Sequence, residues 1–326
     1  MLPFRPLFSN PHWQTIAGAC WPRRIDNTRF PVEEVYYRTE PGTEILVHAQ
    51  RPASPKATLL LVHGLEGSSE AGYMRSAAQT ALDAGFAVHR MNIRGCGGTE
   101  SRSNTLYHAG LTSDVGFIAG QLRRQWGAPV FVAGFSLGGN MVLKLAGELG
   151  DRARDLLAGV CAISTPIDLR ACALALGHPR NWLYQRRFVT NMSARLRRRH
   201  GLMPALFSLD GLESVRSVYE FDDRITAPFF GFDNAERYYG TQSAGLYLDA
   251  IRVPALLVHA KDDPMVPFHV YDHPAFRTNP NVRLLAVDHG GHVAFLSRGP
   301  FRFWADHVLI HWLVEVGNKN PSEVVF

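Results

Sequence analysis

Short apolar runs alternate with longer stretches of helical spacing along most of this 326-residue chain. The apolar runs have the length of buried β-strands, and the stretches between them place apolar residues on one helical face. Repeated strand–helix–strand units of this kind predict an α/β fold, with a mostly parallel sheet and helices on both of its faces. The strands are expected at 57–62, 86–93, 129–135, 158–163, 254–259 and 282–287, and the helices near 70–84, 111–126, 139–149, 267–275 and 301–316.

Two regions depart from this alternation. Residues 32–38 and 44–50 alternate apolar and polar positions, which predicts half-exposed strands at an antiparallel edge of the sheet. Residues 170–245 show no strand pattern and are rich in aromatic residues and arginine, which predicts a helical insertion into a core formed by 1–169 and 246–326. Ligands of α/β sheets bind beyond the carboxyl ends of the strands, so we expect this insertion to cover the site as a cap.

The composition is that of a globular protein. Hydrophobic residues make up 46% of the chain and charged residues 19%, and the length suits one large α/β domain with a sizeable insertion. No run approaches the roughly 18–20 apolar residues of a membrane-spanning helix, and the opening residues MLPFRPLFSNPHWQ lack the continuous apolar stretch of a signal peptide. We therefore expect a cytoplasmic protein without a transmembrane segment.

Cysteine spacing and sequence motifs give no indication of a cofactor. Cys20, Cys96, Cys161 and Cys172 are scattered without the spacing of a zinc site, and we expect reduced, packed thiols rather than disulfides. The chain has no GxGxxG pattern for a dinucleotide, no Walker loop and no HExxH motif. The sequence therefore predicts neither a metal ion nor a cofactor.

The net charge of +5 comes in part from an arginine run at 195–199, RLRRR. Such a run is typical of a solvated helix face, here the outer face of the cap, and it can also contact an anionic membrane surface. No nucleic-acid-binding motif accompanies the run, so nucleic acid is not an expected partner.

The pattern Gly134-Phe135-Ser136-Leu137-Gly138 is the first candidate for chemistry. An apolar strand leads directly into it and a helical stretch leads out, which is the context of a nucleophile elbow. Such a turn strains the serine backbone and presents the hydroxyl at the edge of the sheet, above a helix N-terminus that favours negative charge. We therefore predict that Ser136 is a nucleophile rather than a structural serine in a tight turn.

A serine nucleophile needs a base, and in folds with such an elbow the partners follow in the order Ser, Asp or Glu, His. Asp263 lies just beyond the strand at 254–259 and begins the spacing D-x-x-V-P. We favour it over Asp262, which is then a turn former or helix cap. His292 follows a Gly-Gly pair before the last helix, whereas His289 lies too near the end of its strand to reach the serine easily. The predicted base is therefore His292.

Two backbone N–H groups must hold the oxyanion that forms when a serine attacks a carbonyl group. One should come from Leu137, directly after the serine. The other should come from the loop after the strand at 57–62, where residues 63–67 form an HGxxG pattern. Leu65 is the expected donor in this loop, because Gly64 lets the backbone turn inward.

Two further polar residues lie in loops expected on the same side of the sheet. His63 opens the HGxxG pattern, and we interpret it as a brace of its loop rather than a second catalytic base. Arg94 lies in the glycine-rich segment 92–98, and we interpret it as a brace between loops rather than a substrate contact. The sequence therefore predicts a bracing role for both residues.

Taken together, the motifs resemble the YheT-like branch of the α/β-hydrolase superfamily. The resemblance rests on HGLEGS, NIRGCGG, GFSLGGN, AKDDPMVP and DHGGHVAF, on the opening segment NPHWQTI, on the Ser-Thr-Pro that follows the strand at 158–163, and on ERYYG. It spans nearly the whole chain in the same order and is weakest at about 175–232. It implies an α/β-hydrolase fold and a triad of Ser136, Asp263 and His292. It also implies hydrolysis of carboxylic esters such as acylglycerols, phospholipids or simple esters, or acyl transfer to alcohols.

Three functions are compatible with these residues. The favoured one is a serine esterase that forms an acyl-enzyme with a small-molecule acyl ester, and the leucines and aromatics of the cap favour short-to-medium acyl chains or lipid esters. An acyltransferase would pass the same acyl group to an alcohol, and a non-catalytic protein would use the fold to bind lipid. Dehalogenases and epoxide hydrolases of this fold use an aspartate at the elbow, where this chain has Ser136.

Overall fold

A single sheet lies at the centre of the fold. In the computed structural model, which describes residues 2–318, its eight strands are β1 (Glu33–Glu40), β2 (Thr43–Gln50), β3 (Thr58–Val62), β4 (Ala87–Met91), β5 (Val130–Phe135), β6 (Leu157–Ile163), β7 (Ala255–Ala260) and β8 (Val282–Val287). They are hydrogen-bonded in the order β1-β2-β4-β3-β5-β6-β7-β8. From β4 to β8 in that order all neighbours are parallel, whereas β1 and β2 are antiparallel to their neighbours. The predicted mostly parallel sheet with an antiparallel edge is therefore confirmed.

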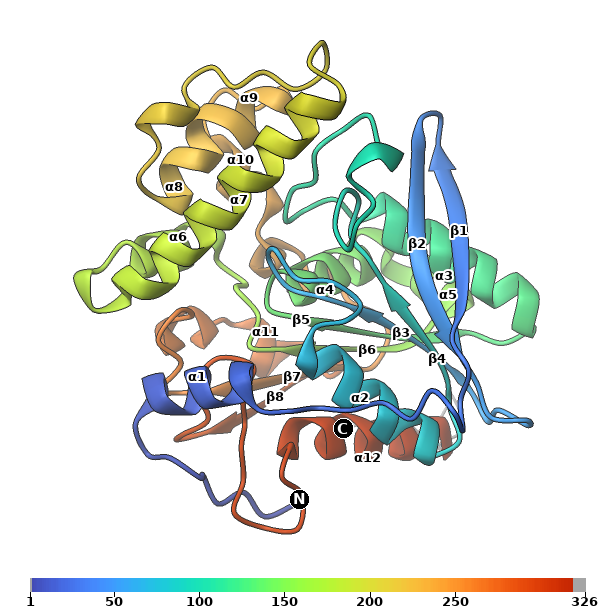
Figure 1. The fold of residues 1–326 in the computed structure, drawn as a ribbon. Coiled ribbons are helices and arrows are strands. Elements are labelled where there is room, and N and C mark those ends of the chain that lie inside the picture. The colour runs from blue at the N-terminus through green and yellow to red at the C-terminus, as the bar shows by residue number, and fades with distance from the viewer. Residues whose placement is uncertain (1, 319–326) are drawn as a thin grey trace.

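Helices cover both faces of the sheet (Figure 1). α2 (Gly72–Asp83) and α12 (Trp304–Asn318) pack against one face. α3 (Ser113–Trp126), α4 (Leu137–Leu149) and α5 (Ala153–Leu156) pack against the other. The remaining helical elements outside the cap are α1 (Pro11–Cys20), α11 (Ala275–Thr278) and the short 3-10 turns η1 (Glu100–Arg102), η2 (Gly150–Arg152), η6 (Ala244–Ala250) and η7 (Phe268–Tyr271).

Burial explains why the inner strands are continuous apolar runs. Every residue of β3 and β5 is buried, because helices cover the sheet on both sides at these positions. Alternate residues of β3 face opposite sides, so that Leu60 and Val62 join the apolar core against α3 and α4. Leu59 and Leu61 join the core against α2 and α12. The edge strand β1 instead alternates between exposed and half-buried residues.

A separate helical layer lies beyond the carboxyl ends of the parallel strands (Figure 1). We call it the cap, and it consists of α6 (Leu169–Leu176), η3 (Pro179–Asn181), α7 (Trp182–Leu202), η4 (Leu212–Ser214), α8 (Val218–Phe221), the π-helix η5 (Asp222–Thr226), α9 (Ala227–Phe229) and α10 (Ala235–Gln242). Some of its apolar residues, among them Met192, Leu196 and Phe221, form a cluster distinct from the two cores of the sheet, whereas others, such as Tyr238, join the core on the side of α4. The bounds 170–245 for this insertion stay a prediction.

One predicted helix is wrong. Of the residues 267–275, which were predicted to form a helix, only Phe268–Tyr271 form the 3-10 turn η7, and the short helix α11 begins at Ala275. Pro267 and Pro274 account for the difference, because a proline lacks the N–H of a helical hydrogen bond and disfavours helical backbone in the residue before it. The two prolines were therefore a stronger signal than the helical spacing between them.

The arginine run in α7 does not form one solvated face. Arg195 and Arg199 lie four residues apart on the same side of the helix, and only 6% and 0% of their surfaces are exposed. Arg199 donates hydrogen bonds to two backbone carbonyls of the segment 103–105, at 2.6 and 2.8 Å. Only Arg197 and Arg198 have exposed side chains. The prediction that the whole run lies on the outer face of the cap was wrong, because tertiary contacts bury one side of α7.

Three further features of residues 2–318 bear on function. None of their helices combines the length and the apolar character needed to cross a membrane. No three His, Cys, Asp or Glu side chains in this part of the chain are grouped so that they could hold a metal ion. The cysteines are free thiols; Cys20 is exposed and the others are buried.

Candidate active site

Ser136 occupies a sharp turn between β5 and α4. Its backbone angles, φ 50° and ψ −121°, lie in a region that residues other than glycine rarely adopt. The neighbouring glycines leave room for this turn. A Cβ atom on Gly134 would lie 2.3 Å from the carbonyl oxygen of Gly138, and one on Gly139 would lie 1.9 Å from Thr165 Oγ1. The turn thus places Ser136 just beyond the end of β5, on the side of the sheet that carries the cap.

The side chains of Ser136, His292 and Asp263 form a continuous row of hydrogen bonds. His292 Nε2 lies 3.0 Å from Ser136 Oγ, and His292 Nδ1 lies 2.8 Å from Asp263 Oδ2. The other oxygen of Asp263 accepts the N–H groups of Met265 and Val266 at 2.9 and 3.0 Å. Burial opposes the ionisation of Asp263, but the charge and hydrogen bond of His292 outweigh it, so the pKa of Asp263 is lowered. A buried carboxylate is therefore held against the imidazole.

Asp262 and His289 form a separate pair. His289 Nδ1 lies 3.1 Å from Asp262 Oδ2, and the other oxygen of Asp262 accepts a backbone N–H of the loop before His292 at 3.0 Å. The side chain of His289 is 47% exposed, whereas that of His292 is 10% exposed. The structure therefore brings Asp263 and His292 to Ser136, and it leaves the competing pair at the surface.

Two backbone N–H groups beside Ser136 are free to bind a ligand. In the loop after β3, the N–H groups on either side of Leu65 donate to tyrosine hydroxyls at 3.0 and 3.2 Å. Within residues 2–318, the N–H groups of Leu65 and Leu137 themselves have no acceptor. Leu137 begins α4, where the first N–H groups of a helix have no partner inside it. Both residues line the same hollow as Ser136, so their N–H groups are available to an oxyanion there.

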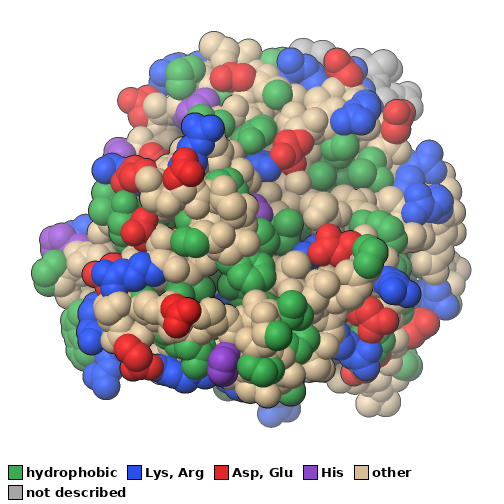
Figure 2. Space-filling view, turned by 90° about the horizontal axis from the view of Figure 1, so that it is seen from above, with side chains coloured by type: hydrophobic (Ala, Val, Ile, Leu, Met, Phe, Trp, Pro, Cys, Tyr) green, Lys and Arg blue, Asp and Glu red, His purple; other side chains and the backbone are tan. Residues whose placement is uncertain are grey.

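Ser136 and His292 line two hollows that meet between them. The first lies under the cap and is mainly apolar. Its apolar lining includes Leu106, Leu169, Leu176, Phe188, Met192, Leu196, Val218 and Phe221. The second opens between α1, the loop after β3 and α7. Figure 2 views the molecule from the cap side, where hydrophobic side chains gather near the middle of the face and Lys and Arg lie mostly towards its rim. The site therefore has an apolar space on one side and a more open one on the other.

Sequence comparison identifies the family. Residues 57–298 match the family described as alpha/beta hydrolase fold. The chain belongs to this family. It is 33% identical to Putative esterase YheT of Escherichia coli (strain K12), over 94% of this chain and 91% of that protein. The predicted resemblance to the YheT-like branch is therefore confirmed.

More distant proteins share the same fold. Phospholipase ABHD3 of Mus musculus is 28% identical over 75% of this hydrolase, and the match covers 60% of that longer phospholipase. A solved structure, the esterase Pf2001 of Pyrococcus furiosus, superposes with a TM-score of 0.62 at 18% identity, over 96% of this chain and 99% of that one. At that identity, the likeness to Pf2001 shows the fold alone.

A buried ion pair joins the cap of this hydrolase to the loop that carries Leu65. Arg195 of α7 contacts both carboxylate oxygens of Glu66, at 2.6, 2.9 and 3.1 Å, and the two side chains are 7% and 6% exposed. The guanidinium also lies 4.5 Å from the ring centroid of Tyr107, whose hydroxyl donates to Glu66 at 2.8 Å. These contacts hold Glu66, whose φ is 55°, in the turn directly after Leu65.

His63 and Arg94 are occupied by contacts within the protein. Burial lowers the pKa of His63 to about 4. One of its ring nitrogens lies 2.7 Å from the carbonyl oxygen of Gly64, and the other accepts the N–H of Ile93 at 3.0 Å. Arg94 forms a two-point ion pair with buried Asp114, with both distances at 2.7 Å. These contacts tie together the loops in which the two residues lie.

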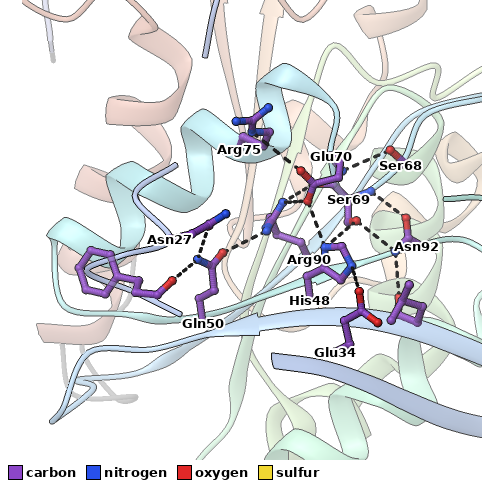
Figure 3. A network of polar contacts seen from close by, with 12 residues as sticks. Asn27, Glu34, His48, Gln50, Ser68, Ser69, Glu70, Arg75, Arg90 and Asn92 are labelled. Atoms are coloured by element: carbon purple, nitrogen blue, oxygen red, sulfur yellow. Dashed lines mark hydrogen bonds and ion pairs between the residues drawn. The ribbon is translucent and has the colours of Figure 1, made fainter. Parts of the chain in front are cut away.

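A polar network ties the loop after β3, which carries Leu65, to the antiparallel edge of the sheet (Figure 3). Arg90 of β4 donates to the carbonyl of Ser69 at 2.6 Å and to Glu70 at 2.7 Å. His48 Nδ1 lies 3.0 Å from the same carboxylate, and Asn92 accepts the N–H of Ser69 at 2.8 Å. The hydrogen bond from His48, with the charge of Arg90, lowers the pKa of Glu70 to about 2 against the effect of partial burial. The loop after β3 is thus held by β2 and β4 on one side and by the cap on the other.

The loop of His292 is held by hydroxyl groups that sequence analysis did not assign. The N–H of His292 donates to Thr15 Oγ1 in α1 at 2.9 Å, and the N–H of Val293 donates to Ser164 Oγ after β6 at 3.0 Å. Val293 and Ser164 both have positive φ, 59° and 51°. Thr15 lies in the NPHWQTI segment and Ser164 in Ser-Thr-Pro, so family resemblance was the signal that could have pointed to them.

Proposed function

We propose that this hydrolase cleaves carboxylic esters through an acyl-enzyme, with Ser136 as nucleophile, His292 as general base and acid, and Asp263 as the carboxylate that orients His292. The observation that carries the proposal is the row of hydrogen bonds from Ser136 Oγ through the imidazole to the buried carboxylate, at 3.0 and 2.8 Å. Esterase and phospholipase are also the activities in the names of the relatives.

The first half of the reaction forms the acyl-enzyme. With Nδ1–H donated to Asp263, His292 Nε2 accepts the proton of Ser136 while the serine oxygen attacks the ester carbonyl carbon. The N–H groups of Leu65 and Leu137 stabilise the negative charge that develops on the carbonyl oxygen. The tetrahedral intermediate then breaks its bond to the alcohol oxygen, and the alcohol leaves with the proton from His292.

The second half returns the enzyme to its starting state. Water gives a proton to His292 Nε2 and attacks the acyl carbon, and the same two N–H groups hold the oxyanion. The bond to Ser136 Oγ then breaks, the carboxylic acid leaves, and the serine recovers its proton. Throughout the cycle the charge of Asp263 stabilises the imidazolium, which explains why a buried carboxylate is useful at this position.

We assign the acyl chain to the apolar hollow under the cap and the alcohol part to the more open hollow. Each methylene that leaves water contributes about 0.8 kcal/mol, so four additional carbons contribute up to about 3 kcal/mol. If that gain persists in the transition state, it raises kcat/KM by about a hundredfold. We therefore expect short-to-medium acyl esters to be preferred over acetyl esters, with a decline once the hollow is full.

The test is a series of p-nitrophenyl esters from acetate to palmitate, with Ser136→Ala as the control. The substitution should lower ester hydrolysis roughly 10⁴–10⁶-fold, because the residues of a triad act as a unit. It should also abolish labelling by a fluorophosphonate probe. Labelling that persists in Ser136→Ala would place the nucleophile elsewhere, and a chain without turnover or labelling would be a lipid-binding protein instead.

Acyl transfer uses the same acyl-enzyme with an alcohol in place of water. Product analysis with added ethanol or glycerol separates the two activities. Free acid as the main product at moderate alcohol concentration supports hydrolysis, and ester as the main product would make this chain an acyltransferase.

A further inference from the structure

A buried carboxyl group lies in the wall of the hollow that we assign to the acyl chain. Asp222 lines this hollow together with Ser136, and only 8% of its surface is exposed. It is the first residue of the π-helix η5, a rare element that often marks functional sites. Its Oδ2 accepts the hydroxyl of Tyr239 at 2.7 Å, and Thr226 forms a second hydrogen bond to its side chain.

No positive charge offsets this carboxyl group. Among residues 2–318, no Lys, Arg or His side chain forms an ion pair with Asp222, and burial raises its pKa to about 6. A buried carboxyl without a counter-ion is costly, and an apolar residue would pack there at less cost, as Val218 does one turn before it and Phe221 directly before it. Packing therefore does not explain why an acid stands at this position.

Further polar side chains line the same hollow. His108, Thr226, Tyr238 and Tyr239 line this space, whose other walls are mainly apolar. Arg195 also lines it, but its charge is paired with Glu66. His108 Nδ1 accepts a backbone N–H at 3.2 Å, so its Nε2 carries the ring proton, and Tyr238 Oη accepts another backbone N–H at 2.8 Å. In this mainly apolar space, an acyl chain that enters from Ser136 can meet the Asp222 carboxyl with its partners Tyr239 and Thr226.

We propose that this hydrolase prefers acyl groups that carry a hydroxyl group, and that Asp222 accepts the hydrogen bond of that hydroxyl. The proposal rests on the proposed function, because it takes the hollow under the cap as the acyl site. An ionised carboxylate is an acceptor with room for several hydrogen bonds, and Tyr239 and Thr226 do not exhaust them. A plain hydrocarbon chain would displace water from Asp222 without replacing its hydrogen bond, which disfavours that chain relative to a hydroxylated one.

Matched pairs of p-nitrophenyl esters test the proposal: hexanoate, octanoate and decanoate, each beside its ω-hydroxy form. The measured quantity is the ratio of kcat/KM for the hydroxylated ester to that for the plain ester. Wild type should favour the hydroxylated ester at the chain length that reaches Asp222, and Asp222→Leu should lower this ratio about tenfold, since one hydrogen bond to a charged group is lost. A loss of stability or of triad geometry lowers kcat/KM for both esters by the same factor, so it leaves their ratio unchanged.

Asp223→Asn is the matched control. The neighbouring Asp223 carboxylate accepts the N–H of Ala235 at 2.9 Å and does not line the hollow, so its loss should leave the ratio unchanged. If Asp222→Leu does not fold, Asp222→Asn takes its place, and it should lower the ratio less because a neutral acceptor remains.

The possible failures are distinct. A ratio that stays the same in wild type and in both Asp222 variants would overturn the hydroxyacyl proposal while ester hydrolysis stands. A wild-type ratio below one at all three chain lengths would overturn it as well. If wild type hydrolyses none of these esters, or if its hydrolysis persists in Ser136→Ala, the result would instead contradict the proposed function on which this proposal rests.

Discussion

At the scale of single residues, the neighbouring carboxylates Asp262 and Asp263 have different partners in the site. Asp263 is fully buried and lies against His292 at 2.8 Å, whereas Asp262 contacts the half-exposed His289 at 3.1 Å. Both carboxylates face the loop after β8, but Asp262 contacts His289 and the N–H of Gly291, whereas Asp263 contacts His292. Neighbouring substitutions can therefore separate a role in the proposed chemistry from a role in the fold.

Asp263→Asn should lower kcat for a p-nitrophenyl ester roughly 10⁴-fold, because an amide neither stabilises the imidazolium nor selects the same tautomer. Asp262→Asn should lower it less than about tenfold, since an amide oxygen can still accept the backbone N–H of the His292 loop. Steady-state kinetics with a thermal-denaturation control would measure both. A larger loss in Asp262→Asn would mean that the orienting carboxylate is assigned one residue too late.

At the scale of elements, α1 belongs to the site although it lies outside the segment that matches the family. It packs directly on the loop after His292, since a Cβ atom on Gly18 would lie 2.5 Å from Ala294 Cβ. Gln14 donates to the carbonyl of Leu296 at 2.7 Å, which ties the same two segments together. The N-terminal helix is thus a support for the histidine loop.

Thr15→Val should therefore lower kcat about tenfold with little change in KM, because the N–H of His292 loses its acceptor and the ring is held less firmly. Thr15→Ser keeps the hydroxyl and should restore most of the activity. The two variants would be compared on one soluble ester. Equal activity of both with wild type would show that α1 does not position His292.

The helix α7 has two chemically different sides. Arg195→Met leaves the buried charge of Glu66 without its counter-ion and should lower the free energy of unfolding by about 3–5 kcal/mol. Removing both charges, with Arg195→Met and Glu66→Gln together, should recover part of this loss. Urea denaturation would measure it.

The control for this prediction is the double change Arg197→Gln and Arg198→Gln on the exposed side of α7. These side chains form only surface ion pairs, so the free energy of unfolding should change by less than about 0.5 kcal/mol. Arg199 is left intact because it is buried. Stability of Arg195→Met equal to that of the control would contradict a structural role for the buried ion pair.

At the scale of the whole molecule, stability should depend on buried carboxyl groups. Burial raises the pKa of Asp222 and of Asp306 to about 6. Such a group is protonated in the folded chain at a pH where it is already ionised in the unfolded chain. Its contribution to stability is therefore fully present below the unfolded pKa and is lost as the pH rises through about 6.

The free energy of unfolding of Asp222→Asn should accordingly increase relative to that of wild type as the pH rises from 4 to 7. A pKa raised by about two units corresponds to about 3 kcal/mol in the difference between their free energies of unfolding. The loss of the Tyr239 contact shifts this difference by an amount that does not depend on pH, so the slope is the informative quantity. Denaturant unfolding at several pH values would measure it, and a difference that stays flat would show that Asp222 ionises as readily in the folded chain as in the unfolded one.

Local patterns in the sequence predicted the sheet, its antiparallel edge and most of its helices. Buried strands must be apolar on both faces, and each such run is complete within a few residues. The same holds for Ser136, because a strand, two glycines and a helix are all contiguous in the chain. The motifs after β7 and β8 likewise singled out Asp263 and His292, whose side chains the structure brings to the serine.

Tertiary structure alone decided which polar groups lie inside. Nothing local distinguishes Arg195 from Arg197, and the difference arises because Glu66, far away in the chain, faces one side of α7. Thr15 and His292 are likewise 277 residues apart, and their contact exists only because α1 folds back over the site. In the sequence Asp222 does not differ from other acidic residues, and only the packing of the cap shows that it is buried. Sequence periodicity reports which residues leave water, whereas a buried charge or hydroxyl is explained only by the partner that the fold places opposite it.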